Sequence, residues 1–90
     1  MNIKAIVYNN NKNEIIDKFT VIKDGCRINF DNLRKYCSDS CQYEDIKYTI
    51  DLLNDYGFDY FKNGICTKGI YVFRSYDFAE LKYIIEFREF

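Results

Sequence analysis

Residues 39–57 read DSCQYEDIKYTIDLLNDYG, and this segment carries the clearest structural signal in the chain. Apolar side chains recur in it at intervals of three and four residues, which is the spacing of one face of an α-helix. They are Tyr43, Ile46, Ile50 and Leu53. Asp39 followed by Gln42 resembles a capping box, and Gly57 can end a helix in the left-handed conformation. The segment therefore predicts an amphipathic helix.

The residues before this helix predict three strands. Alternation and β-branched residues indicate strands over residues 3–8 and 15–22, and the asparagine-rich run 9–13 separates them. The first half of the second strand is also compatible with a helix. The run 23–25 ends in Asp and Gly, which favour tight hairpin turns, so residues 26–30 are predicted to pair back as a third strand.

A second pair of strands is predicted after the main helix. Residues 58–62 and 70–74 have the composition of strands. Two turn signals, Asn63-Gly64 and Lys68-Gly69, compete for the hairpin between them, so the register of this pair stays open.

Two shorter helices are predicted outside these elements. Asp31 can cap one over residues 31–37. Asp77 with Glu80 gives a second capping-box start, and apolar residues follow helical spacing over residues 77–90. Alternate residues of the same segment are also apolar, so a final strand is the alternative. These residues are Tyr83, Ile85 and Phe87.

The predicted order is β-β-β-α-α-β-β-α, which corresponds to a small α+β domain. Its antiparallel sheet of two hairpins has the helices on one face and gives two layers. A chain of 90 residues has room for one domain, so residues 1–90 are predicted to fold as a single unit. Aromatic residues make up 19% of the chain, and such rings fill cores and also form binding surfaces.

The sequence lacks the residues that are characteristic of several classes of function. Histidine is absent, which removes the commonest general base and the usual partner of a nucleophile, so the chain is predicted not to be an enzyme. No apolar run approaches the roughly 18 residues of a membrane-spanning helix. The N-terminus also lacks the features of a secretory signal, and a cytoplasmic location is therefore expected.

Four cysteines are present, at Cys26, Cys37, Cys41 and Cys66. Their spacing contains no C-x-x-C pair, and reduced thiols are expected in a cytoplasmic protein. A zinc site built from four thiolates is the alternative, although a spacing typical of such sites occurs only between Cys37 and Cys41. No metal ion and no cofactor is predicted.

Acidic charge is concentrated around the main helix. Residues 38–59 contain six acidic side chains and one lysine, whereas residues 1–37 contain seven basic and four acidic side chains. The acids and one tyrosine recur at intervals of three and four, so they are expected to line one exposed stripe. The predicted partner-binding residues are Glu44, Tyr48, Asp51, Asp55 and Asp59.

This pattern favours a non-enzymatic protein-binding module. Repulsion along the acidic stripe would be relieved by a protein partner with a basic surface, for instance a nucleic-acid-binding protein. An ordinary solubilising face is the competing interpretation. If the stripe binds a partner, charge reversal at Asp51 and Asp55 should weaken binding and leave thermal stability nearly unchanged.

Direct binding of single-stranded nucleic acid is the alternative function. It would use an aromatic and basic sheet face that stacks bases. The candidate residues are Tyr8, Tyr60, Tyr71, Lys4, Lys62 and Arg74. The acidic balance of the chain argues against this alternative, because nucleic-acid affinity depends largely on phosphate neutralisation.

The general profile of the chain resembles the small inhibitors that phages encode against host defence systems, including anti-CRISPR proteins. The chain is short, acidic to neutral, rich in Asn, Ile, Lys and Tyr, and without a catalytic signature. This resemblance is one of composition and transfers no functional residue. It implies an inhibitor of a host defence nuclease complex that acts in the host cytosol.

Overall fold

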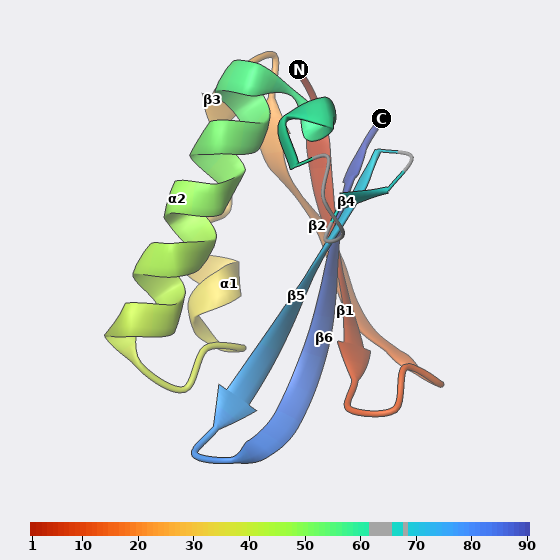
Figure 1. The fold of residues 1–90 in the computed structure, drawn as a ribbon, viewed down its shortest axis with the longest axis vertical. Coiled ribbons are helices and arrows are strands. Elements are labelled where there is room, and N and C mark those ends of the chain that lie inside the picture. Colours follow the sequence, from red (N-terminus) through yellow and green to blue (C-terminus); the bar gives the residue numbers. More distant parts are fainter. Residues whose placement is uncertain (62–65, 68) are drawn as a thin grey trace.

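One antiparallel sheet organises the structure, which is a computed structural model. It describes residues 1–61, 66–67 and 69–90. The side chains of residues 60, 61, 66 and 67 are not described. The strand order among these residues is β3-β2-β1-β6-β5-β4. The strands are β1 Ile3–Asn9, β2 Ile15–Lys23, β3 Cys26–Arg27, β4 Cys66–Thr67, β5 Ile70–Asp77 and β6 Glu80–Glu89. The first and last strands therefore lie side by side at the centre of the sheet (Figure 1).

The two central strands bury alternate residues on one face. Ile3, Ala5 and Val7 of β1 are fully buried, as are Ile85 and Phe87 of β6. The antiparallel register places Ala5 opposite Phe87 and Val7 opposite Ile85. Because successive side chains of a strand point to opposite faces, these pairs form one continuous apolar surface.

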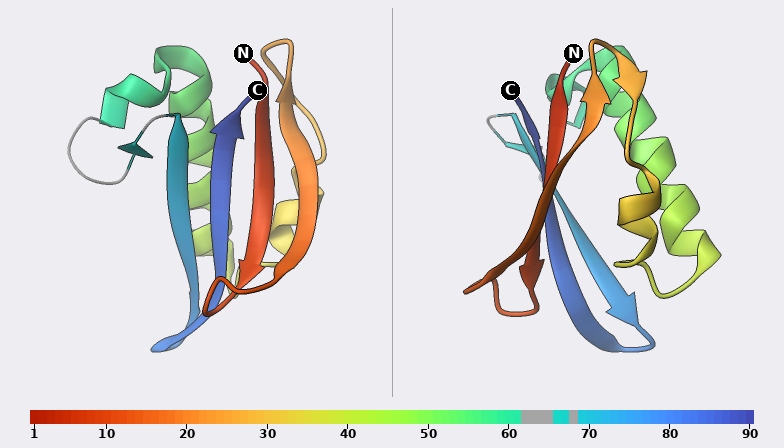
Figure 2. Two further views of the ribbon diagram at one scale, coloured as in Figure 1. Left: turned by 90° about the vertical axis from the view of Figure 1, so that its right-hand side faces the viewer. Right: turned by 180° about the vertical axis from the view of Figure 1, so that it is seen from behind.

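The helices cover that apolar surface. They are α1 Asp31–Arg34 and α2 Ser40–Tyr56, and both lie on the same side of the sheet (Figures 1 and 2). The buried residues of α2 are those of the predicted apolar stripe, Tyr43, Ile46, Ile50 and Leu53. The predicted α+β class is thereby confirmed, whereas the predicted order of strands and helices is not matched in detail.

α2 is capped by Asp39 and followed by Gly57 as predicted. However, the described hydrogen bonds of the Gln42 side chain go to Ser38, Ser75 and Tyr76 rather than back to Asp39, and Gly57 is not in the left-handed helical region. The side chain of Asp39 accepts a hydrogen bond of 2.9 Å from the backbone N–H of Gln42. Gly57 adopts φ 82° and ψ 169°, a combination that is essentially restricted to glycine. Its N–H donates to the carbonyl of Leu53, which satisfies one of the last helical acceptors.

Two details before α2 differ from prediction. The cap of α1 is Phe30, without a side-chain hydrogen bond, and Asp31 is the first helical residue. The third strand is limited to Cys26–Arg27, because Asn29 adopts a φ of 54° that ends the extended conformation. The predicted turn before it is correct, since Asp24 and Gly25 both have the positive φ of a tight hairpin.

The predicted strand over residues 58–62 is wrong. Phe58–Phe61 form a 3₁₀ helix, η1, and Lys62 lies outside the described residues. The chain turns there because Phe58, directly after Gly57, is buried in the core. The turn signal Asn63-Gly64 and the residue Lys68 also lie outside the described part of the chain.

The predicted C-terminal helix is wrong as well, and the alternative strand is correct. Asp77 pairs with Glu80 across a two-residue turn, so the capping-box pattern lies in a β-hairpin. β6 pairs with β5 on one side and with β1 on the other. These pairings and the burial of Ile85 and Phe87 outweigh the local preference for a helix.

The hairpin turn between β5 and β6 places a bulky residue in a strained conformation. Phe78 has a φ of 56° and a fully exposed side chain. We expect Phe78→Asn to raise the free energy of unfolding by about 1 kcal/mol, because asparagine tolerates this conformation better. Urea unfolding measures the change. Ala79→Asn is the control, since Ala79 has no positive φ, and a destabilised Phe78→Asn variant would contradict the turn geometry.

Candidate functional site

The outward face of α2 presents acidic and tyrosine side chains to solvent. Glu44 and Asp55 are exposed, and the side chain of Tyr48 is 66% exposed. Tyr56, which the sequence did not single out, is 64% exposed on the last turn. At 1.5 Å per residue the two tyrosines lie about 12 Å apart along the helix. The predicted stripe is thus a real feature of the helix surface.

Asp51 belongs to this stripe but is tied to the sheet. Its carboxylate accepts a hydrogen bond of 2.9 Å from Nε of Arg27, and a second contact joins Nη2 of Arg27 to the other carboxylate oxygen. The hydrogen bond to Asp51 raises the pKa of Arg27, although desolvation lowers it. A lysine at residue 51 would therefore face Arg27, and the expectation of unchanged stability is reasonable only for Asp55.

The two ends of the predicted site behave differently. Nζ of Lys47 lies 3.2 Å from the carboxylate of Glu44, which partly compensates that charge. Asp59 is exposed but lies on η1, beyond Gly57, where the chain leaves the helix axis (Figure 1). The structure therefore brings Glu44, Tyr48, Asp51 and Asp55 onto one helix face and leaves Asp59 outside it.

The opposite face of the sheet is a second candidate surface, because no described helix covers it (Figure 2, left). We call it the basic sheet face and define it by the side chains of β1, β2, β5 and β6 that alternate with the buried core residues. These are Lys4, Ile6, Tyr8, Ile16, Lys18, Thr20, Ile70, Val72, Arg74, Ile84, Glu86 and Arg88. Four of them are cations and one is a carboxylate.

That carboxylate, Glu86, is only 3% exposed and is held by three neighbours. It lies 2.6 Å from Nζ of Lys12 and 2.8 Å from Nη2 of Arg88, and the hydroxyl of Tyr8 donates to it over 3.2 Å. Burial raises the pKa of Glu86, but the hydrogen bonds from Lys12 and Arg88 outweigh this effect and lower it. Glu86 is therefore a paired, buried anion beneath a basic surface.

The residues predicted for base stacking are only partly brought together. Tyr8, Lys4 and Arg74 lie on the basic sheet face. Tyr71 does not, because it is 9% exposed and packs in the core against Phe87. The side chains of Tyr60 and Lys62 lie outside the described residues.

Tyr8 is a poor stacking platform. Nζ of Lys12 lies 5.3 Å from its ring centroid, and its hydroxyl is engaged with Glu86. The aromatic surface that base stacking needs is therefore not assembled by the described side chains of this face.

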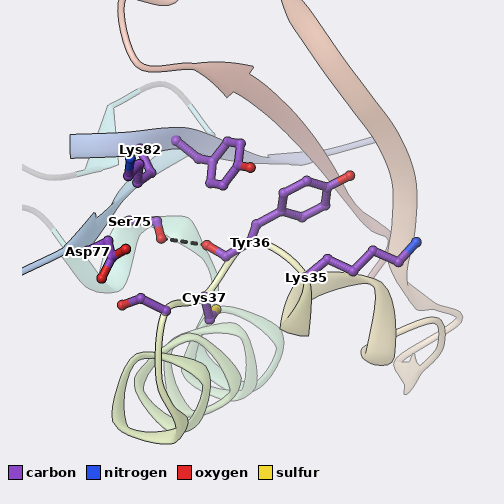
Figure 3. Close-up of a pocket in the computed structure, with 8 residues that line it drawn as sticks. Lys35, Tyr36, Cys37, Ser75, Asp77 and Lys82 are labelled. Carbon is purple, nitrogen blue, oxygen red and sulfur yellow. Dashed lines mark hydrogen bonds between the residues drawn. The ribbon is translucent and has the colours of Figure 1, made fainter. Parts of the chain in front are cut away.

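A pocket of about 290 Å³ lies between the segment after α1 and the β5–β6 hairpin (Figure 3). The rings of Tyr36 and Tyr83 meet edge to face on one wall, with centroids 5.1 Å apart. Ser75 is buried and donates its hydroxyl to the carbonyl of Tyr36, which fixes the hairpin to the chain before α2. Lys35 and Lys82 also line the pocket.

Two groups that line this pocket, the Cys37 thiol and the Tyr36 hydroxyl, have raised pKa values. Burial raises the pKa of the Cys37 thiol to about 11. Burial, together with the hydrogen bond to Asp17, raises the pKa of Tyr36 to about 12. Neither group supplies a nucleophile or a base at neutral pH.

The cysteines whose side chains are described are all free thiols. Cys26 and Cys41 are exposed and free, and Cys37 is free and half-buried. The side chain of Cys66 lies outside the described residues. Among the described side chains, no three of the types His, Cys, Asp or Glu are grouped so that they could hold a metal ion.

Comparisons with known proteins return no match: no family model fits the chain, and no curated protein and no solved structure is significantly similar to it. Within the described part of the chain, no helix combines the length and the apolar character that crossing a bilayer requires.

The pairing of Glu86 predicts a pH-dependent contribution to stability. Because the pKa of Glu86 is lowered in the folded state, its pairing stabilises the fold above the unfolded pKa of about 4.3. This stabilisation is lost as the pH falls through the folded pKa. Glu86→Gln lacks this contribution. Urea unfolding at pH 7, 5, 4 and 3 should therefore show the stability gap between wild type and Glu86→Gln narrowing below about pH 4.3. A gap that stays constant would contradict the assigned pairing.

Proposed function

We propose that the chain is a non-enzymatic protein-binding module that docks the outward face of α2 on a basic surface of a protein partner. The observation that carries this proposal is the exposure of Tyr48 and Tyr56, at 66% and 64%, beside the exposed acids Glu44 and Asp55. Tyrosine rings that would bury large apolar areas are typical anchors of protein interfaces.

The electrostatics of this face support the same proposal. The acids around the two tyrosines would steer the face toward a positively charged partner and reject acidic ones. Asp51 contributes indirectly, because its ion pair with Arg27 joins the helix to β3. The face would thus meet a partner with its carboxylates already arranged around the rings.

Rigidity of the helix also supports docking. The inner side of α2 is fixed by four buried residues, and its N-terminus is capped by Asp39. The side chain of Gln42 accepts from the backbone N–H of Tyr76 and donates to the carbonyl of the same residue, which ties the first turn to the β5–β6 hairpin. A surface that is already ordered loses little conformational entropy on binding.

A finer version of the proposal concerns the kind of partner. The compositional resemblance to phage-encoded inhibitors supports a nucleic-acid-handling protein as the target, and the finest form is inhibition of a host defence nuclease complex. The cytoplasmic location expected from the sequence belongs to this finer version. The face on α2 does not depend on it.

The test is capture of a protein partner from nuclease-treated lysate by the tagged chain, compared between variants. Tyr48→Ala combined with Asp55→Lys should weaken capture at least tenfold, since loss of an anchor costs about 1.4 kcal/mol or more. Glu14→Lys is the matched control, because Glu14 is exposed away from α2 and the change of charge equals that at Asp55. Circular dichroism checks the folding of each variant. Equal capture by the double variant would remove α2 from the interface.

A further inference from the structure

Cations from four neighbouring segments converge on the basic sheet face. The register places Lys4 opposite Arg88 on β6 and opposite Thr20 on β2, and places Lys18 opposite Ile6. Neighbouring strands lie about 4.8 Å apart, so these side chains rise beside one another from adjacent strands. Arg74 on β5 lies at the other end of this face, opposite Ile84, which is itself opposite Tyr8.

The positive charge of this face is not compensated locally. Lys12 and Arg88 share the single carboxylate of Glu86. Lys4, Lys18 and Arg74 have no acidic partner among the described residues. With Lys12 counted, five cations and one carboxylate leave a net charge of about +4 on this face, although the whole chain has a net charge of −1.

A shallow hollow lies within the basic sheet face. It has a volume of about 250 Å³ and is lined by Lys4, Lys18, Phe19 and Thr20. Two ammonium groups and one hydroxyl provide hydrogen-bond donors for the oxygens of a phosphate. The cation of Lys4 also lies 5.8 Å from the ring centroid of Phe90, which favours a position above the sheet.

We propose that the basic sheet face binds the phosphate backbone of a nucleic acid without reading its sequence. Spread-out cations on an open sheet suit a chain of phosphates, and charge complementarity supplies the affinity. The occupied ring of Tyr8 leaves no stacking platform among the described side chains, so base identity has little effect. The face lies on the side of the sheet opposite α2, so the inference does not rest on the proposed function (Figure 2).

Fluorescence anisotropy with the purified chain tests this inference. The probes are a labelled 20-nucleotide single strand and a 20-base-pair duplex, each of mixed sequence, titrated between 50 and 200 mM salt. Neutralising about four phosphates predicts a slope of log affinity against log salt of about −3 for the single strand and about −4 for the duplex. The slopes report how many phosphates the face neutralises, and the two affinities at equal salt concentration show which form of nucleic acid it prefers.

Two matched variants localise the binding. Lys4→Glu with Lys18→Glu should weaken binding more than tenfold and reduce the slope by about two. Lys35→Glu with Lys82→Glu changes the net charge equally but lies at the pocket on the helix side of the sheet, and it should retain affinity within about threefold. Equal weakening by both pairs would overturn the assignment of the site to this face.

A third variant keeps the inference testable if the charge-reversed pair does not fold. Glu86→Gln removes the carboxylate of the basic sheet face and should strengthen binding and steepen the slope by about one, even though it lowers stability. Unchanged or weaker binding by the folded Glu86→Gln protein would contradict the inference. An affinity for poly-glutamate equal to that for nucleic acid would also contradict it, because the face would then suit an acidic protein. The absence of binding to either nucleic acid at 50 mM salt would contradict it as well.

Discussion

The pairing of β1 with β6 is the constraint on which the rest of the structure depends. It runs from Ile3 opposite Glu89 to Asn9 opposite Tyr83 and joins the two ends of the chain at the centre of the sheet. β2 joins this central pair through β1, and β5 joins it through β6. The helices then cover the apolar face whose centre is formed by this pair. The register of one strand pair therefore positions both candidate surfaces, the outward face of α2 and the basic sheet face.

The same register separates the charges of the molecule. Ala5 points into the core, and its neighbours Lys4 and Ile6 point to the other face. A slip of one residue would bury Lys4 and expose Ala5, so burial of the core also fixes where the cations lie. The acidic helix covers the apolar side, and the basic side stays open. A chain that is almost neutral thereby has two faces of opposite charge.

Local signals predicted the elements that local interactions determine. The apolar stripe of α2, its cap at Asp39 and the hairpin at Asp24-Gly25 each lie within a few residues of sequence, and all three are present. The stripe of Glu44, Tyr48, Asp51 and Asp55 follows from helical spacing in the same way. The C-terminal strand was predicted as a helix because Asp77 and Glu80 are a local pattern, whereas β6 is determined by partners at the far end of the chain. Tyr8, Lys4 and Arg74 of the basic sheet face were named from the sequence, but the Arg27–Asp51 ion pair and the places of Lys18 and Arg88 beside Lys4 need knowledge of strand pairing, which no spacing along the sequence supplies.

The central position of the terminal strands also determines when the chain can fold during synthesis. β1 is made before the other described strands of this sheet and its partner β6 after them, so the apolar side of β1 has no complete sheet to join until β6 has been translated. Contacts between the ends of a chain make folding slow, because a long loop must close before they form. Until then one edge of β1 is unpaired and open to other chains. The nascent sheet is therefore most prone to aggregation just before β6 emerges.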